Sequence, residues 1–238
     1  MKNLNIFTLL LITVISMIYV SCGNLFPMIG NGNLAASERR VSAFEKISSG
    51  GSSEIRFHAS GEYRVVVTTD SNLIDFVTTD IRNNVLNIGF KRNSYSFTKI
   101  YVDVYCPTLT GVSISGSGSF TGNDTIITST FDSIVSGSGE INGTIECNNF
   151  SAKITGSGKI NISGNGKDLD IIISGSGTFS GNNFAINNAA VRVSGSGRAN
   201  IFVSENLNVG ITGSGEVNYR GSPRIESKVS GFGRINKL

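Results

Sequence analysis

The sequence predicts an all-β fold: a single-stranded β-helix-like solenoid of about seven coils of 18–21 residues, preceded by a less regular β region. Three observations predict it: a short phrase with a period near 20, columns of similar residues when its copies are aligned, and a composition rich in glycine. Successive first glycines of the phrase are 21, 19, 19, 20, 18 and 18 residues apart. The phrase is Ser/Thr-Gly-x-Gly, and its seven copies begin at Ser115, Ser136, Thr155, Ser174, Ser194, Thr212 and Ser230.

The strand before each phrase alternates between apolar and polar positions. Positions four and six residues before the first glycine are mostly apolar, and the positions between them are mostly polar. This period of two is typical of a half-buried strand, so the apolar columns are expected to point inward. The position two residues before the glycine is β-branched in every copy, with Ile114, Val135, Ile154, Ile173, Val193, Ile211 and Val229.

The Gly-x-Gly itself is expected to be a corner between two strands. A second apolar column begins four residues after the first glycine, so the alternation is reset there. Glycine accepts a positive φ and lets neighbouring coils approach closely, which suits a sharp bend. The middle residue is Ser in six copies and Phe232 in the last, where no further coil has to stack. The second column is Phe120, Ile141, Ile160, Phe179, Ala199, Val217 and Ile235.

Two polar columns flank that second apolar column. The residue after it is Asn in five of seven copies, which predicts a ladder of amides that fixes the register of the coils and is not a binding site. The residue before it alternates in charge, so Glu140 is expected beside Lys159, and Glu216 between Arg198 and Arg234. The alternative for this column is a charged stripe that grips a polymer, but its signs largely cancel.

The N-terminus indicates export. Lys2 precedes an apolar run from residue 4 to 20, and Ser21-Cys22-Gly23 follows. This arrangement resembles a bacterial lipoprotein signal peptide, which implies cleavage after residue 21 and a lipid on Cys22. The alternative is an uncleaved anchor, although 17 mostly apolar residues are at the short edge of a membrane-spanning helix. Residues 22–43 lack periodicity and are interpreted as a tether, so the partner expected at this end is the membrane.

The remaining chain, residues 44–238, is interpreted as one domain. Residues 44–110 alternate as irregular N-terminal strands that cap the solenoid, and residues 111–238 carry the repeats. Asn83-Asn84 is expected to form a tight turn. Net charge is +3 with 16% charged residues and no Lys/Arg run, which excludes a nucleic-acid partner on electrostatic grounds.

The whole pattern resembles the head GIN domain family of auto-transporter adhesins of secreted and lipid-anchored bacterial proteins, particularly of the Bacteroidetes. The resemblance rests on the strands from Phe44 to Pro107 and on the phrase Ser-Gly-x-Gly-x-Ile-Asn, clearest at 136–142 and 155–161. It implies a β-helix-like fold and a surface or periplasmic role. It offers no catalytic residues to carry over.

Catalytic chemistry is sparse, and the sequence predicts no catalytic, cofactor-binding or metal-binding residues. His58 is the only histidine and is expected to be a surface or packed polar residue. Asp168 and Asp170 straddle Leu169 on one outward face, where solvation is favoured over catalysis or calcium binding. Aligned on the repeat, Cys106 and Cys147 lie two coils apart, too far for a disulfide, so both are predicted to be thiols.

Three functions remain open. The favoured one is a non-enzymatic envelope lipoprotein that presents a β-solenoid surface for adhesion or for protein or glycan contact. The second is a carbohydrate-binding module accessory to glycan uptake, for which Tyr101 and Tyr105 on one strand face are the candidate platform. The third is a β-helix polysaccharide-cleaving enzyme. Residues 23–27 lack the acidic run that resembles a surface-export signal, so the periplasmic face of the outer membrane is the expected location.

Overall fold

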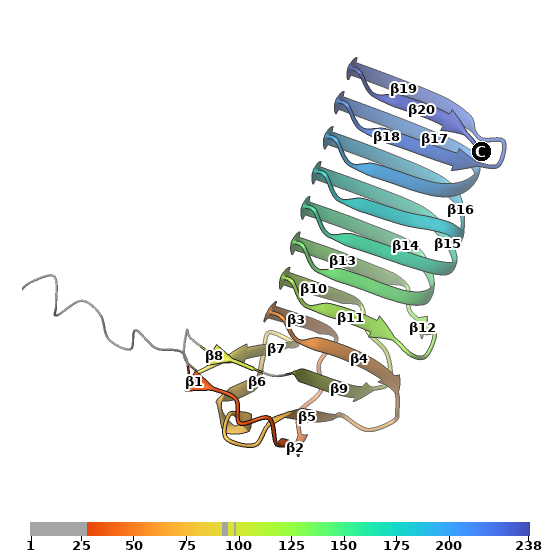
Figure 1. The fold of residues 1–238 in the computed structure, drawn as a ribbon. Helices are drawn as coiled ribbons and strands as arrows, with labels where there is room; N and C mark the ends of the chain where they lie inside the picture. Colours follow the sequence, from red (N-terminus) through yellow and green to blue (C-terminus); the bar gives the residue numbers. More distant parts are fainter. Residues whose placement is uncertain (1–27, 92–94, 98) are drawn as a thin grey trace, which may run out of the picture.

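The computed structural model describes residues 28–91, 95–97 and 99–238 and shows a β-solenoid that rises from an irregular sheet region. The coils stack in sequence order, with the C-terminal coil at the end farthest from the N-terminal strands (Figure 1). Besides strands, the described residues contain one short 3-10 helix, η1 (Ile74–Phe76). The predicted fold class is confirmed, while the predicted signal segment and Cys22 lie outside the described residues.

Each coil contributes one strand to each of two parallel sheets, which meet at the glycine corner. We name them the pre-corner and post-corner sheets after the position of the strand relative to that corner. The pre-corner sheet contains β3 (Lys46–Gly51), β10 (Gly111–Gly116), β13 (Thr130–Gly137), the second halves of β14 (Glu140–Gly156), β15 (Lys159–Gly175), β16 (Thr178–Gly195) and β17 (Arg198–Gly213), and β19 (Arg224–Gly231). The post-corner sheet contains β4 (Glu54–Ala59), β11 (Ser119–Gly122), β12 (Ile126–Ile127), the first halves of β14 to β17, β18 (Glu216–Arg220) and β20 (Arg234–Lys237).

The glycine corners stack directly on one another. At Gly175 the backbone has φ +117°, and a Cβ there would lie 2.6 Å from the carbonyl oxygen of Gly156 in the coil below. That oxygen accepts a hydrogen bond from the N–H of Ser176 at 2.9 Å. A side chain at this position would therefore both strain the backbone and push the coils apart, which explains why the corner repeats as glycine.

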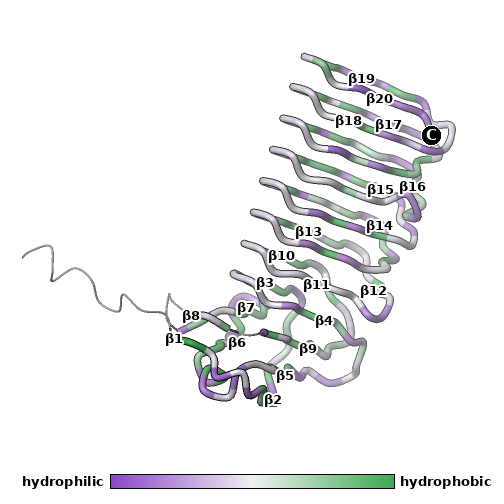
Figure 2. Tube along the Cα trace, viewed as in Figure 1, coloured by the Kyte–Doolittle hydropathy of each residue, from purple (hydrophilic) through white to green (hydrophobic). Residues whose placement is uncertain are grey.

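The core is a stack of the inward columns that the repeat predicts. Ile154, Ile160, Ile173 and Phe179 are each fully buried, and hydrophobic positions recur along successive coils (Figure 2). Phenylalanine rings of successive coils touch, as between Phe131 and Phe150 with centroids 5.7 Å apart. Burial of these columns supplies the main driving force for stacking.

The predicted amide ladder forms along the post-corner sheet. Asn161 donates from Nδ2 to Asn142 Oδ1 at 2.8 Å, and Asn218 donates in the same way to Asn200 at 2.9 Å. Asn236 extends the second run by donating to Asn218 at 2.9 Å. Ser180 occupies the rung between the two runs. The register pairs the amides of adjacent coils, as expected.

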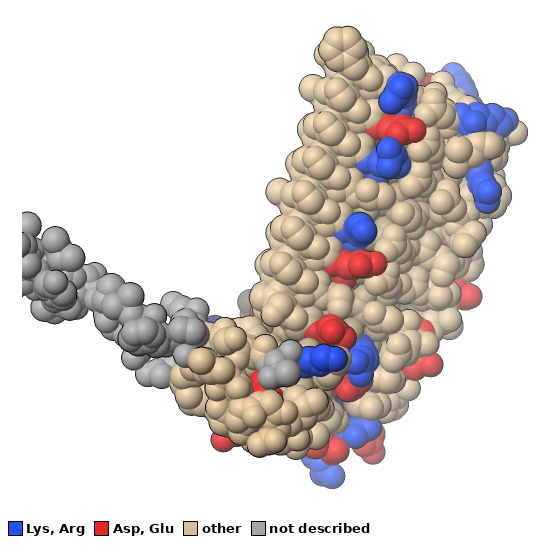
Figure 3. Space-filling view, viewed as in Figure 1, with Lys and Arg blue, Asp and Glu red and all other residues tan. Residues whose placement is uncertain are grey.

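The alternating charges fall beside one another in the register that the repeat predicts (Figure 3). Arg198 contacts Glu216 at 3.0 Å, and Asn236 donates to the same carboxylate at 3.0 Å. The hydrogen bond from Arg198 holds the pKa of the Glu216 carboxyl below its usual value. The Arg198 side chain is 54% exposed and that of Glu216 is 23% exposed, so solvent screens the pair and it favours the correct register more than it adds stability.

The N-terminal end is capped by strands that continue both sheets. On the post-corner side, β9 (Ile100–Cys106) lies parallel to β4, and β5 (Arg64–Asp70) and β2 (Leu34–Arg40) follow antiparallel. On the pre-corner side, β7 (Val85–Phe90) lies parallel to β3 and β6 (Val77–Arg82) is antiparallel to β7. β1 (Met28–Ile29) pairs with β8 (Tyr95–Ser96). Asn83 and Asn84, both with positive φ, form the expected turn between β6 and β7.

Two predicted boundaries need correction. The tether predicted over residues 22–43 is wrong for its second half, because β2 pairs along its length with β5. Arg39 in β2 also donates to the carbonyl oxygens of Val77 at 2.7 Å and of Ile74 at 3.0 Å, which ties the two sides of the cap together. Secondly, the irregular region predicted over 44–110 contains one regular coil, β3–β4, whose corner Gly51 aligns with Gly116. The sequence there reads Gly50-Gly51-Ser52-Ser53, which hid the phrase.

This extra coil changes the predicted separation of the cysteines. Cys106 ends β9, and β4 and β11 lie between β9 and the strand that holds Cys147, so the two residues are three strands apart instead of two coils. Both cysteines are free thiols, as predicted. Burial raises the pKa of Cys106 to about 12 and that of Cys147 to about 11.

Candidate functional site: a polar groove across the coils

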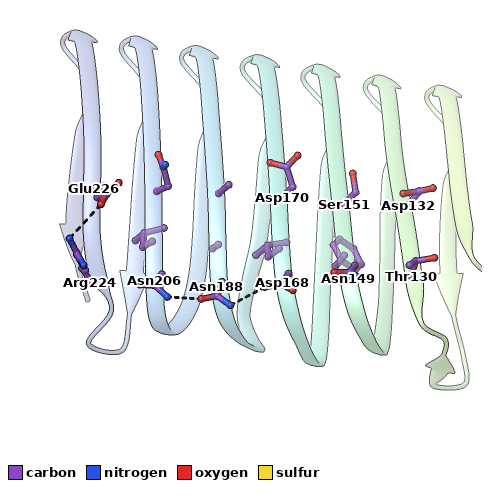
Figure 4. A pocket seen from close by; sticks show the side chains of 16 residues that line it. Thr130, Asp132, Asn149, Ser151, Asp168, Asp170, Asn188, Asn206, Arg224 and Glu226 are labelled. Carbon is purple, nitrogen blue, oxygen red and sulfur yellow. Dashed lines mark hydrogen bonds and ion pairs between the residues drawn. The ribbon is translucent and has the colours of Figure 1, made fainter.

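A groove of about 600 Å³ crosses the pre-corner sheet from β13 to β19. It lies where each coil turns into its pre-corner strand, and it runs along the solenoid axis, so each coil contributes the same three positions (Figure 4). Two outward columns form its walls and the inward column between them forms its floor. One wall is Thr130, Asn149, Asp168, Asn188, Asn206 and Arg224, and the other is Asp132, Ser151, Asp170, Ala190, Asn208 and Glu226.

The first wall contains a second amide ladder. Asn188 donates from Nδ2 to Asp168 Oδ1 at 2.9 Å, and Asn206 donates to Asn188 Oδ1 at 2.8 Å. Each amide nitrogen carries two hydrogens, and the ladder uses one of them. Asn188 and Asn206 therefore each keep a second N–H on this wall, beside the acceptor carboxylate of Asp168, at the ~4.8 Å separation of adjacent strands.

The carboxylates of the groove have cationic or amide partners. Asp170 accepts from Arg192 at 3.0 Å and Asp132 from Lys46 at 2.7 Å. At the open end, Arg224 and Glu226 lie 3.8 Å apart. Asp168 and Asp170, which the sequence placed on one outward face, stand on opposite walls. Because their charges are engaged by Asn188 and Arg192, the groove resembles a polar binding surface more than a pair of catalytic acids.

The floor of the groove lies over an inward apolar column. Its residues are Phe150, Leu169, Ala189 and Leu207, whose side chains are buried in the core with exposed fractions between 1% and 6%. At the coil of β16 both the floor residue, Ala189, and the wall residue, Ala190, are small. Small side chains widen the groove at that coil, while the polar walls continue on either side.

The tyrosine platform that the sequence suggested is occupied by other side chains. Tyr105 in β9 stacks on His58 of β4, with centroids 4.7 Å apart and planes inclined by 15°. Arg64 of β5 lies over the same ring at 3.9 Å, and β5 flanks β9 on the side opposite β4, so both faces of Tyr105 are covered. Arg56 similarly lies 4.3 Å from the centre of the Tyr101 ring.

His58 is a packed polar residue, as expected from the sequence. Besides stacking on Tyr105, its Nε2 lies 3.1 Å from Asp103 Oδ1. The side chains of both residues are roughly a quarter exposed, at 27% and 21%. The His58–Asp103 contact joins β4 to β9 and so helps hold the cap to the first coil.

A second, more open hollow of about 420 Å³ lies on the post-corner sheet next to the first amide ladder. Thr144 and Ser163 exchange a hydrogen bond of 2.9 Å there, and the buried Oδ1 of Asn182 has no partner among the described residues. The hollow spans fewer coils than the pre-corner groove. We therefore take the groove as the candidate site.

The structure adds two findings on other site types. In the described ranges 28–91, 95–97 and 99–238, no three His, Cys, Asp or Glu side chains gather in a group that could hold a metal ion. Over the same residues, no helix has the length and apolar character needed to cross a membrane.

The sequence contained a signal for the groove that the repeat alignment did not use. Aligned on the first glycine, the seventh residue before it is short and polar in Thr130, Asn149, Asp168, Asn188 and Asn206. Such a column beside a buried one is the same signature that identified the first amide ladder. What the sequence could not show is the bend of each coil at this point, which makes the two outward columns face each other across a groove.

Comparison with known proteins agrees with this architecture. The family model described as "Putative auto-transporter adhesin, head GIN domain" matches residues 43–223. The chain belongs to the head GIN domain family. The resemblance noted in the sequence is thereby confirmed, and a search of curated proteins found no match.

Solved structures of three bacterial proteins share the fold. A protein from Bacteroides fragilis described as a putative adhesin superposes with a TM-score of 0.83 at 20% identity, covering 89% of this chain and 100% of that one. A protein from Parabacteroides merdae with the same description gives 0.73 at 25% identity, covering 89% and 98%. One from Parabacteroides distasonis, described as a putative lipid binding protein, gives 0.76 at 25% identity, covering 90% and 100%.

Proposed function

We propose that this protein is a non-enzymatic adhesin of the bacterial cell envelope that binds an extended, uncharged glycan chain along the pre-corner groove. The observation that carries the proposal is the groove itself, which repeats two polar walls over successive coils. Membership of an adhesin family supports the adhesive role and a place in the envelope.

The chemistry of the groove favours a neutral glycan. Amide and hydroxyl groups on the walls donate to and accept from sugar hydroxyls. The acidic wall residues Asp132 and Asp170 already have Lys46 and Arg192 as partners, so the groove offers neither a cationic cluster for acidic polymers nor a free acid pair for hydrolysis. Binding is expected to be weakly dependent on salt because few charges take part.

The direct test measures binding of the full chain to a glycan array and compares two tryptophan substitutions. Ala190→Trp fills the groove where it is widest and should abolish binding. Lys153→Trp, the matched control, adds the same bulk to an exposed outward position of the same sheet that does not line the groove, and it should leave binding unchanged. Loss of binding with both variants, or with neither, would contradict the assignment to the groove.

Two further arms separate the alternatives. Tyr101→Ala should retain glycan binding, whereas a carbohydrate site on the tyrosine face predicts its loss. Asp168→Asn should leave glycan length unchanged because no cleavage is expected in the wild-type protein either; turnover that this variant abolishes would instead support a polysaccharide-cleaving enzyme. Binding to phospholipid vesicles that Ala190→Trp removes would favour a lipid ligand, which is the description carried by the Parabacteroides distasonis structure.

The proposal includes a lipid anchor on Cys22, supported by the apolar run before it and by the small residues on both sides. Cys22→Ser should move the protein from the membrane fraction to the soluble fraction and remove incorporation of a labelled fatty acid. Protease treatment of intact cells then distinguishes the leaflets. A protected protein fits the periplasmic face, and a protein shaved from whole cells fits the surface.

A further inference from the structure

The two ends of the solenoid differ in the strands that form their edges. At the N-terminal end, β2 and β6 are antiparallel edge strands that carry charged residues, including Arg39, Arg40 and Asp80. At the C-terminal end, β19 pairs only with β17 and β20 only with β18 among the described strands, so the outer edge of each has no ladder partner. β19 also carries Arg224, Glu226 and Lys228, so charge alone does not distinguish the two ends, and a strand that pairs with β19 must complement these charges.

The last coil also exposes the end of the core. Ile225 and Val229 of β19 are 38% and 43% exposed, whereas Leu207 and Ile211, their neighbours in the preceding coil, are each 1% exposed. Phe232 at the final corner is 88% exposed. Ile225 and Val229 continue the inward columns, so another strand laid on β19 would bury them as β19 buries those of β17, whereas Phe232 occupies the outward middle position of the corner.

We propose that a second copy of this chain covers that end, with β19 pairing antiparallel to β19 of the other copy about a two-fold axis at Ser227. In this register Ile225 lies opposite Val229 of the second copy, which joins the two cores. Glu226 lies opposite Lys228 of the second copy, and the symmetry makes this contact twice. Cross-strand pairs of this kind are what stabilises an antiparallel ladder.

Periodicity and charge together select this register. A strand's inward residues must face inward residues, so the axis of an antiparallel pair of identical strands must pass through a residue. Moving the axis one residue to Glu226 places that carboxylate against itself and sets Arg224 against Lys228. Moving it to Lys228 sets two ammonium groups against each other. Axes at Ile225 or Val229 avoid like charges but lie nearer the ends of the strand and pair fewer residues, whereas Ser227 lies near the middle of Arg224–Gly231 and sets Glu226 against Lys228.

The contact is expected to close at two copies. A two-fold interface uses the same surface on both partners, and the capped N-terminal ends then point outward at both ends of the pair. A head-to-tail stack would instead place β19 against the antiparallel, charged edge at β2 or β6 and would build a filament. The structure therefore assigns a dimer about twice the length of one solenoid.

Cysteine cross-linking of the full chain, purified in detergent, tests the axis. In Ser227→Cys the two Cα atoms lie opposite each other at about 4.5–5.5 Å, within the range of a disulfide. Mild oxidation should therefore give a band of doubled mass on a non-reducing gel, and reductant should remove it. The matched control is Ser230→Cys on the same strand, whose two copies lie about 20 Å apart in this register and should not cross-link. The thiols at Cys106 and Cys147 are common to both variants. Equal cross-linking of the two variants, or none with Ser227→Cys, would overturn the proposal.

Charge reversal tests the register independently of any disulfide. Lys228→Glu places carboxylates opposite each other twice and should weaken dimerisation about tenfold or more, measured by light scattering across a concentration series. Adding Glu226→Lys to the same chain restores opposite charges and should restore the dimer. A wild-type protein that remains monomeric at all concentrations, or a double variant no tighter than Lys228→Glu alone, would refute it.

Discussion

Replacing one corner glycine with alanine tests the physical basis of the repeat. Gly213 has φ +109°, and a Cβ there would lie 2.7 Å from the carbonyl oxygen of Gly195 in the coil below. Gly210, three residues earlier in the same strand, faces open space, with nothing within 4 Å of an added Cβ. The same chemical change at these two positions should therefore have opposite effects on stability.

The magnitude follows from the geometry. Holding alanine at a positive φ costs about 1–3 kcal/mol. Ordinary contact begins near 3.4 Å, so the coils must also separate by about 0.7 Å, which would stretch the 2.9 Å hydrogen bond from the Ser214 N–H to Gly195 beyond useful length and remove a further ~0.5–1.5 kcal/mol. We expect Gly213→Ala to lower the free energy of unfolding by about 2–4 kcal/mol. Gly210→Ala should raise it by up to about 1 kcal/mol, since alanine restricts the unfolded chain.

Urea denaturation followed by circular dichroism measures both variants. Because neighbouring coils stabilise each other, the loss of one corner can unfold the C-terminal coils before the rest. Either a lower midpoint or a shallower dependence of the unfolding free energy on urea would therefore show destabilisation. If Gly213→Ala is as stable as Gly210→Ala, the corners do not require glycine, and the repeat needs another explanation.

Three other predictions concern the ladder, the thiols and one carboxylate. Ser180→Asn should join the two runs of the post-corner amide ladder and raise the unfolding free energy by about 0.5–1.5 kcal/mol in urea denaturation; a destabilised variant would show that Ser180 is required for packing. A thiol reagent at pH 8 should react slowly with Cys147, more slowly with Cys106, and rapidly with both after unfolding, because burial raises both pKa values; fast reaction of Cys106 in the folded protein would contradict its burial. The Glu216 carboxyl should titrate below its usual pKa by NMR and move upward in Arg198→Gln. Its contribution to stability is present above the unfolded-state pKa and is lost as the pH falls through the lowered folded-state value, and an unchanged titration in the variant would refute the role of Arg198.

Much of the solenoid could be predicted because its determinants are local and repeated. A β-branched residue two positions before each glycine, and glycine at each corner, fix the inward face and the bend without reference to distant residues. The coil β3–β4 escaped this reasoning because Ser53 replaces the second glycine of its corner. The cap escaped it for another reason: β2 is held by pairing with β5 and by Arg39, contacts between residues far apart in the chain that leave no period in the sequence.

The candidate site was only partly predictable. Asp168 and Asp170 were recognised as outward residues on one strand, but alternation alone treats every outward position as equally solvated. The bend that turns their columns toward each other depends on how the floor residues pack, which no single strand reveals. The suggested tyrosine platform was too exposed in the sequence-based prediction. Alternation along the strand identified Tyr105 as outward-facing, but it could not show that His58 and Arg64 of neighbouring strands cover the ring.

The architecture separates what the chain needs for folding from what it offers to a ligand. Corners and inward columns are tightly restricted, since each must fit the coil above and below, whereas the walls of the groove contain Thr, Asn, Asp, Ser, Ala and Arg at equivalent positions. A residue on the wall can therefore change without disturbing the stack. Because the coils are ~4.8 Å apart, a chain lying along the axis meets a new pair of wall positions at that interval. A ligand with a regular repeat near this spacing would make similar contacts at successive coils, and its affinity should grow with its length until the groove from β13 to β19 is filled.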